Sequence, residues 1–553
     1  MWRKYPNAWR GGGFCGTLVN MRTGTLKRRE FFRRGGALAA LAASGAPGGG
    51  AAELKVGPGI YESIGVKPIV NCKGTFTIVS GSQSLPEVKR AMDEASRHYV
   101  HIDELMLGVS KRLAEITQAP WGIVTAGCAA ALTHATAACI AGADPEKMQR
   151  LPNLTGLKSE VISPAYSRNV YDHAIRMLGV KMIDVNTPAQ LESAISEKTA
   201  MIMILAGDGD DGPLGTEAVA KIARAKKVPV LVDAAAEHLT IPNVHLKRGA
   251  TMVAYSGGKC IRGPQCAGVL LGPKDLLQAA WLNSAPHHAF GRSLKVGKEE
   301  IVGMLTAVEM WAKRDHDAEW KQWESWLGHI SVSVTKVDGV TTQVVQPRGL
   351  SNRAPHMVIK WDAAKLGITG QEVEKLLLAG SPRIIVGGSS GGRRDKAGSS
   401  ITIMPYMMMP GDERLAAGRI NSLLAKPPKI DRPERPTGQP ADVDGQWEVQ
   451  LDYVYGSAQH AVVFEQKGGE LVGTHQGDIL AGDLSGTVEG NEIRFRSSHR
   501  IEGTRLGYDF TGAFDGGIIR GTVDLGEYGQ AKFTAHRHKY GTPGGLVRPV
   551  KNV

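Results

Sequence analysis

A lysine set among glycines is the side chain in this sequence most suited to covalent chemistry. Lys259 lies in the run Ser256-Gly-Gly-Lys-Cys-Ile-Arg-Gly-Pro-Gln265, directly after an apolar segment, 251–255, that is typical of a strand. An amine held in a tight, partly desolvated turn can lose its proton near neutral pH and attack an aldehyde. A solvated loop lysine would have the same local sequence, so the interpretation depends on partners elsewhere in the chain.

Two further segments could supply those partners. Asp233 ends the apolar run Val228-Pro-Val-Leu-Val-Asp233, and 125–131, Thr-Ala-Gly-Cys-Ala-Ala-Ala, joins the end of an expected strand to the start of an expected helix. The free N–H groups and the dipole of a helix N-terminus attract anions. An aspartate at a strand end can equally cap a helix, and a turn of small residues can simply pack, so each feature is weak by itself.

Together these residues match what pyridoxal phosphate (PLP) requires. A protein holds PLP through a Schiff base to a lysine and places an acid beside the pyridine nitrogen. Lys259 would be that lysine, Asp233 the acid, and the turn at 125–131 a cup for the phosphate. Ser256 could add a hydroxyl group to the phosphate, and Ala235 is small enough to lie against the ring. The sequence therefore predicts PLP as the cofactor.

The elements that must position these residues follow a repeating pattern. Residues 121–272 alternate short apolar segments with helical stretches, which predicts an α/β fold with a doubly wound, mostly parallel sheet. Residues 299–330 are expected to be helical, and the spacing of their tryptophans indicates packing rather than a binding cage. A smaller α/β unit is expected from about 335 to 424. The predicted strands are 122–125, 160–163, 181–185, 201–206, 228–233, 251–255, 267–271, 355–360, 383–386 and 401–404.

The C-terminal part of the chain has a different character. A polar stretch with five prolines predicts a stiff linker. The residues after it alternate in period two between glycine turns, which predicts an antiparallel β barrel or sandwich. No acid/base pair is evident there, so binding or stabilisation is its expected role. The expected organisation is a leader (1–52), a PLP-binding large domain (53–330), a small α/β domain (331–424), a linker (425–442), the β domain (443–540) and a tail (541–553).

The formal net charge of +12 is concentrated at the N-terminus. Residues 1–52 contain nine Lys and Arg and one Glu, so they carry +8 and leave only +4 on the remainder. We therefore expect no nucleic-acid partner. No apolar run reaches the roughly 18 residues needed to cross a bilayer, so no stable membrane span is expected. The six cysteines are scattered, without CxxC or zinc spacing, so no metal is expected.

The basic leader has the order of an export signal. Lys27-Arg-Arg-Glu-Phe-Phe-Arg33 precedes an Ala-rich stretch, 35–43, and resembles a twin-arginine signal with Arg28 and Arg29 as the pair. Cleavage near Ala51 is then expected, with Met21 as an alternative start. The interpretation predicts the twin-arginine export machinery as a partner and a periplasmic or extracellular location. A fortuitous basic amphipathic start is the alternative.

Five stretches resemble one family of fold-type I PLP enzymes. They are 61–71, 124–131, 230–237, 256–265 and 291–301, and the resemblance covers about residues 58–424. The family is that of bacterial L-seryl-tRNA(Sec) selenium transferase (selenocysteine synthase) and its D-glucosaminate-6-phosphate ammonia-lyase-like relatives. The segment 256–265, which holds the lysine, is its most diagnostic piece.

The resemblance implies a role for each matching position. Lys259 would be the Schiff-base residue and general acid/base, and Asp233 the partner of the ring nitrogen. Residues Gly127, Cys128, Ala129 and Ser256 would hold the phosphate, and Arg292, Arg383 and Arg168 would bind the substrate's anionic groups. A surface role is equally open for Arg383. The family often places a histidine and an arginine near Arg168, but here Tyr166 is present and the histidine is missing.

The resemblance implies an enzyme, and the leader helps to choose between the reactions known in the family. Seryl-tRNA transfer needs a tRNA-binding domain where this chain has its export-like leader. We therefore expect a lyase that abstracts the α-proton of a small amino acid or amino sugar acid and eliminates at the β-carbon. Selenium transfer and a non-catalytic secreted scaffold are the alternatives. A homodimer or larger homo-oligomer is implied, because neighbouring subunits usually complete sites of this fold type.

Overall fold

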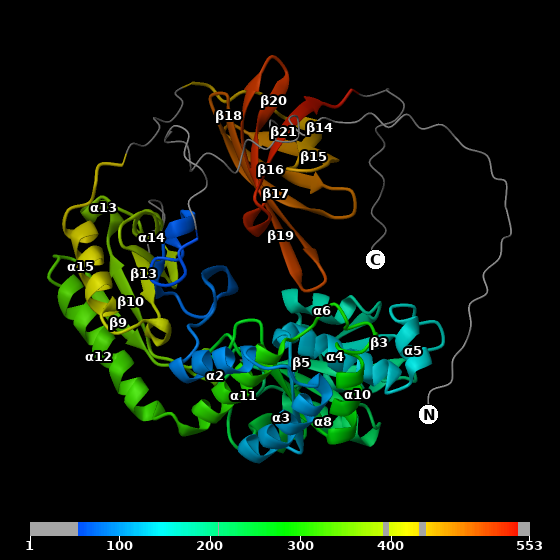
Figure 1. The fold of residues 1–553 in the computed structure, drawn as a ribbon. Coiled ribbons are helices and arrows are strands. Elements are labelled where there is room, and N and C mark those ends of the chain that lie inside the picture. Colours follow the sequence, from blue (N-terminus) through cyan, green and yellow to red (C-terminus); the bar gives the residue numbers. More distant parts are fainter. Residues whose placement is uncertain (1–53, 208, 391–397, 431–437, 540–553) are drawn as a thin grey trace, which may run out of the picture.

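The computed structural model describes residues 54–207, 209–390, 398–430 and 438–539. The expected leader, with Arg28 and Arg29, and the expected tail lie outside these residues. Within them the chain forms a large α/β domain, a small α/β domain and a β barrel (Figure 1). No helix of the described part is long and apolar enough to cross a bilayer.

A seven-stranded sheet forms the centre of the large domain, in the order β2-β8-β7-β6-β5-β3-β4. Strands β3 to β7 run parallel to one another, which confirms the mostly parallel sheet. Strand β8 is antiparallel to β7, because a parallel crossover needs a dozen or more residues and the β7–β8 connection is shorter. It is also antiparallel to β2. The bounds are β2 (Trp121–Thr125), β3 (Glu160–Pro164), β4 (Lys181–Val185), β5 (Thr199–Leu205), β6 (Val230–Asp233), β7 (Met252–Ser256) and β8 (Gly268–Gly272).

Helix α4 is the main helix behind the candidate site. Its sequence is mostly alanine and other small residues, so it packs closely against β5, β6, β7 and β8 and is almost wholly buried. The helices of this domain are α2 (Pro86–Ser96), α3 (Ile102–Thr117), α4 (Gly127–Ala141), α5 (Pro145–Arg150), α6 (His173–Arg176), α7 (Pro188–Ala194), α8 (Thr216–Ala225), α9 (Val244–Lys247), α10 (Lys274–Leu282) and α11 (Lys298–Lys313).

The small domain has its own core. An antiparallel sheet in the order β12-β13-β10-β9 packs with α12, α14 and α15, and a parallel pair, β1 and β11, lies beside it. The bounds are β1 (Ile69–Cys72), β9 (Thr341–Val345), β10 (His356–Trp361), β11 (Arg383–Val386), β12 (Gly388–Ser390), β13 (Ser399–Ile403), α12 (His316–Val334), α13 (Ala363–Leu366), α14 (Gly370–Ala379) and α15 (Asp412–Ala425).

The domain boundaries differ from the expected 53–330 at both ends. Strand β1 pairs with β11, and Cys72 is buried in the core of the small domain. Helix α12 also contributes Leu327 and Val334 to that core. Four residues of a strand and a continuous helix give no sequence cue to the domain in which they pack. The small domain therefore contains the first described strand and the C-terminal half of α12.

The C-terminal domain is a closed antiparallel barrel of eight strands, which decides between the predicted barrel and sandwich. Strand β14 pairs with β21 and closes it, so no strand edge is left open. Trp447, Phe464 and Phe510 fill its interior. The bounds are β14 (Gly445–Asp452), β15 (Ser457–Lys467), β16 (Glu470–Gln476), β17 (Ala481–Glu489), β18 (Glu492–Ile501), β19 (Thr504–Asp515), β20 (Ile518–Asp524) and β21 (Gln530–Arg537).

A histidine cluster occupies part of the barrel interior. His460 Nδ1 and His475 Nε2 share a hydrogen bond of 2.8 Å, and His475 Nδ1 lies 2.5 Å from Ser497 Oγ. His499 is buried, and within the described part of the chain neither of its ring nitrogens has a hydrogen-bond partner. Desolvation by burial lowers the pKa of all three histidines, that of His475 to about 2. The folded barrel therefore holds them neutral.

This cluster predicts an acid-labile barrel. Below about pH 6.5 the histidines of the unfolded chain become protonated, whereas those of the folded barrel stay neutral. The free energy of unfolding should therefore decrease as the pH is lowered, by about 1.4 kcal/mol per pH unit for each histidine. Denaturant titrations at pH 7.5 and 5.5, followed by hydrogen exchange in barrel peptides, measure this. His499→Gln should remove about a third of the dependence, whereas replacing the exposed His536 in the same way should not. Equal stability at both pH values would contradict the prediction.

Candidate active site

The topology of the large sheet places Lys259 and Asp233 at the same edge. Asp233 is the last residue of β6, and Lys259 lies in the loop that follows the neighbouring parallel strand β7. Register pairs Asp233 with Ala254, five residues before the lysine. Burial raises the pKa of Asp233, and the charge of Lys259 acts in the opposite direction. The two residues thus form an electrostatic pair at the carboxyl end of the sheet.

Asp233 is held by two donors on one oxygen. Its side chain is 2% exposed, and Oδ1 accepts from the amide of Ala235 at 3.0 Å and from Cys128 Sγ at 3.4 Å. Burial raises the pKa of Cys128 well above its ordinary value, so its thiol stays protonated and donates. The sequence interpretation gave Cys128 only a place in the phosphate cup. A side chain more than a hundred residues away gives no spacing cue by which its contact with Asp233 could have been found.

The expected phosphate cup lies where β2 meets α4. Gly127 has φ +83°, a conformation that favours glycine, and Thr125 Oγ1 donates to its carbonyl oxygen at 2.8 Å. No side chain caps the first turn of α4 in the described part of the chain. The amides of Gly127, Cys128 and Ala129 are therefore available to an anion.

Gly268 on β8 lets the start of α4 come this close to the sheet. A Cβ on Gly268 would lie 2.6 Å from the carbonyl carbon of Gly127 and 2.7 Å from the amide nitrogen of Cys128. We expect Gly268→Ala to displace this turn and raise the Kd for PLP about tenfold or more. Absorbance titration of the apo protein with PLP measures this. Gly328→Ala, in open space on α12, is the matched control and should bind PLP normally.

The described residues fit PLP on three independent features. The two described contacts of Asp233 use Oδ1 alone, so Oδ2 can accept from a protonated pyridine nitrogen. Lys259 is half-buried beside this carboxylate. A Cβ added to Gly127 would meet no described atom within 4 Å, which leaves room for a phosphate at the uncapped helix. Ser256 and Ala235, both half-buried, lie next to each other, since the amide of Ser256 donates to the carbonyl oxygen of Ala235.

The three arginines expected to bind substrate lie in three different settings. Arg292 is exposed, and its side chain makes no hydrogen bond or ion pair within the described residues. Arg383 lies on β11, where its guanidinium donates to the carbonyl oxygens of Leu378 and Lys67. No contact in the described structure brings either arginine to Lys259. Their substrate-binding roles remain predictions.

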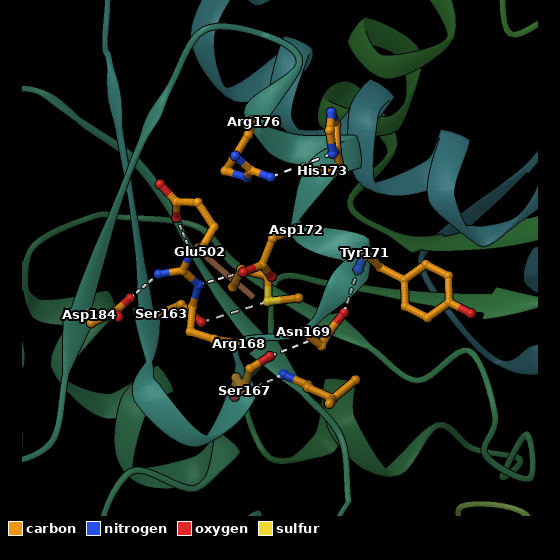
Figure 2. Close-up of polar contacts among 12 residues, drawn as sticks. Ser163, Ser167, Arg168, Asn169, Tyr171, Asp172, His173, Arg176, Asp184 and Glu502 are labelled. Atoms are coloured by element: carbon orange, nitrogen blue, oxygen red, sulfur yellow. Dashed lines mark hydrogen bonds and ion pairs between the residues drawn. The ribbon is translucent and has the colours of Figure 1, made fainter. Parts of the chain in front are cut away.

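The structure corrects the expected role of Arg168. Its side chain is 3% exposed, and all three of its nitrogens bond to carboxylates, those of Asp172, Asp184 and Glu502 (Figure 2). Burial opposes its charge, but these bonds outweigh the burial and raise its pKa. An arginine engaged on every nitrogen is not available to a substrate carboxylate. Arg168 instead connects the large domain to the barrel, because Glu502 belongs to the β18–β19 turn.

A cavity of about 420 Å³ lies beside the lysine loop, with Cys260 in its wall. Trp311, Trp320 and Trp323 face it, so these tryptophans line a hollow rather than only packing. Arg353 lies over the ring of Trp320, 5.7 Å from its centroid. The remaining lining residues include His238, Leu239, Thr240, Arg314, His316, Asp317, Glu319, Leu350, Tyr406 and Met407.

The fold and the site define the class of protein. Residues 89–291 match the Aminotransferase class-V family, whose members of this fold use PLP. The carboxyl-edge lysine, the buried aspartate and the uncapped helix are the parts that such an enzyme needs. The protein is therefore a PLP-dependent enzyme of the class-V aminotransferase fold.

The relatives narrow this class to one family. The chain is 30% identical over 336 residues to D-glucosaminate-6-phosphate ammonia lyase of Salmonella typhimurium, covering 58% of this chain and 88% of the relative. A solved structure of D-glucosaminate-6-phosphate ammonia-lyase matches with a TM-score of 0.59 and 26% identity, over 66% of this chain and 98% of that one. The chain belongs to the PLP-dependent family of this ammonia lyase.

Two other relatives carry different activities. A 5'-C-glycyluridine monooxygenase-decarboxylase of a Streptomyces species is 27% identical over 399 residues, 68% of this chain and 94% of the relative. L-Seryl-tRNA(Sec) selenium transferase of Proteus mirabilis is 24% identical over 135 residues, only 22% of this chain and 28% of that protein. The family resemblance seen in the sequence is confirmed, and the reaction must be argued from the site.

Proposed function

We propose that the protein is a lyase that removes the α-proton of an amino acid or amino sugar acid and eliminates a group from the β-carbon. The observation that carries this proposal is the arrangement of Lys259 beside a buried Asp233 that is itself held by Cys128 and Ala235. That arrangement would hold a carboxylate beside the ring nitrogen of bound PLP, which would favour chemistry at the α-carbon.

Each residue of the set has a distinct task. When bound, PLP supplies an electron sink for the electron pair left at the substrate's α-carbon. Lys259 would hold the cofactor, and its Nζ, once free, could take the α-proton of the substrate and return a proton to the leaving group. Asp233 would keep a negative charge beside the ring nitrogen, and the donors on Oδ1 keep that carboxylate from rotating. The amides at the start of α4 bind the phosphate.

The cavity beside the lysine loop supports a substrate larger than a simple amino acid. Tryptophan faces pack well against the C–H faces of a sugar chain or ring, and a guanidinium pairs bidentately with carboxylate or phosphate. Trp320 and Arg353 offer both in one place. An amino sugar acid with a remote anionic group therefore fits this protein better than serine does.

The test is product analysis on the PLP-loaded protein. D-glucosaminate-6-phosphate and L-serine are incubated separately with the wild type and with Lys259→Ala, while ammonia, 2-oxo acid and dissolved oxygen are followed. Ammonia and 2-oxo acid formed by the wild type without oxygen uptake support the lyase. Oxygen uptake with release of carbon dioxide would assign the protein to the monooxygenase branch. Absence of any product across a panel of amino acids would favour the non-catalytic scaffold.

Export remains part of the proposal, on the twin-arginine pattern at Arg28 and Arg29. A tagged full-length chain is expected in the periplasmic or extracellular fraction, and Arg28→Lys with Arg29→Lys is expected to hold it in the cytoplasm. A wild-type chain found in the cytoplasm with bound tRNA would instead support selenium transfer.

A homo-oligomer is proposed because neighbouring subunits usually complete sites of this fold type. Val56, Ile78 and Tyr99 are large apolar side chains that are 90%, 87% and 101% exposed, and a neighbouring subunit would cover them. Light scattering of the purified protein should give at least twice the 59.1 kDa of the chain. A monomer at micromolar concentration would overturn this part of the proposal.

A further inference from the structure

A tight turn of the barrel contacts the large domain. Residues Glu502 and Gly503 join β18 to β19, and this hairpin extends toward α6 (Figure 1). A Cβ added to Gly503 would overlap the backbone of Asn169, so only glycine allows the turn to sit against the segment 165–172. Glu502 then places its carboxylate on Arg168 (Figure 2).

Glu502 has a backbone conformation that is unfavourable for a residue with a side chain. Its φ is +52°, in the left-handed region where glycine or asparagine is favoured. A glutamate at such a position is strained relative to glycine. Within the described structure, the carboxylate of Glu502 accepts a hydrogen bond from Arg168.

Arg168 is in turn coupled to the candidate active site. It bonds to Asp172, which is 1% exposed and whose Oδ1 has no hydrogen-bond partner among the described residues, so the guanidinium is its principal neutralising group. Burial raises the pKa of Asp172, and Arg168 opposes this. Burial raises the pKa of Asp233, and the negative charge of Asp172 adds a smaller contribution in the same direction.

The backbone of this segment is also fixed to the strand beside Asp233. The amide of Leu205 donates to Ser167 Oγ at 3.1 Å, and Leu205 is the register partner of Asp233 in β5 and β6. A shift of residues 167–172 would therefore move groups next to the carboxylate that we assign to the ring nitrogen.

From these contacts we infer that Glu502 is a positioning residue for the PLP site, contributed by the barrel and acting through Arg168 and Asp172. This inference rests on the proposed role of Asp233. Three carboxylates share one guanidinium, so the charge left on Asp172 depends on how strongly Glu502 competes for Arg168. Through Glu502 the barrel therefore contributes to the electrostatic potential at the PLP site. This contribution is separate from any ligand that the barrel itself binds.

The experiment uses the full-length, PLP-loaded protein and the pH dependence of its visible absorbance. Glu502→Gln removes one negative charge and lets Arg168 neutralise Asp172 more completely. A less negative surrounding disfavours the protonated form of the loaded site, so the pH midpoint of the absorbance change should fall by about half a unit. Glu502→Asp should restore most of the wild-type midpoint. Glu465→Gln, on the exposed face of β15, should leave it unchanged.

Hydrogen exchange in residues 165–172 separates positioning from a merely structural role. Faster exchange together with a shifted midpoint supports the inference. Faster exchange with an unchanged midpoint, or no change in either, overturns it. A wild-type protein that takes up no PLP overturns the proposed function first, and a coloured wild type with an unaltered Glu502→Gln spectrum overturns this inference alone.

Discussion

Lys259→Ala is expected to abolish covalent retention of PLP and to lower kcat by at least about 10⁴-fold. Alanine has no amine to bind the aldehyde and no base to move the α-proton, so two functions are lost together. Borohydride treatment of the wild type should fix the cofactor to the peptide that contains Lys259, as detected by mass spectrometry. The variant should release all of its PLP on denaturation after the same treatment.

Two further variants make this result specific. Lys259→Arg keeps a positive charge beside Asp233 but offers no nucleophilic amine, so it should fail as alanine does. Lys221→Ala removes an exposed lysine from α8 and should retain colour and activity. Cofactor fixed to another lysine in the wild type would show that Lys259 is not the attachment site.

Asp233→Asn is expected to keep PLP but to lower kcat by about 10²- to 10³-fold. The amide occupies the same space but cannot hold a charge beside the ring nitrogen. The cofactor should still bind through Lys259 and the start of α4, so the absorbance band should persist with an altered position. Single-turnover kinetics with the best substrate from the product screen measures the loss at the chemical step.

The same substitution should stabilise the protein without cofactor. Burial raises the pKa of Asp233 above that of the unfolded chain, so folding costs free energy at every pH where the carboxylate must be charged. That cost is absent in strong acid and grows as the pH rises above about 4. At pH 7 the apo Asp233→Asn protein should therefore have a higher Tm than the apo wild type. A lower Tm would indicate that Asp233 has a cationic partner in the apo protein other than Lys259.

The large sheet and the positions of its chemical groups were predictable because they depend on local order. Strands alternating with helices bring their carboxyl ends to one edge, and both Asp233 and the Lys259 loop follow such strands. The apolar run of β8 did not indicate its reversed direction, since parallel and antiparallel strands buried on both faces share the same composition. The available cue was the connection from β7, which is too short for a parallel crossover.

Contacts between distant segments could not be predicted, because they do not depend on local sequence order. Cys128 donates to Asp233, and Arg168 binds Glu502, across separations that no periodicity spans. Arg168 was expected at the substrate because a family position implied it. The added barrel supplies a carboxylate there, which a resemblance covering residues 58–424 does not include. The tryptophans near 311–323 show the same difficulty, because helical spacing is identical for a packed face and for a cavity wall.

The pairing of β1 with β11 has a consequence for how the chain is made. All strands of the large sheet have been synthesised by Gly272, so that domain can fold while the ribosome is still translating. Strand β1 must wait for residues 383–386, which emerge about 310 residues after it. Until then its edge is unpaired and open to chaperones or to other nascent chains. Assembly of the small domain is therefore a late event, and truncated chains that end before β11 should be recognised by their exposed N-terminal segment.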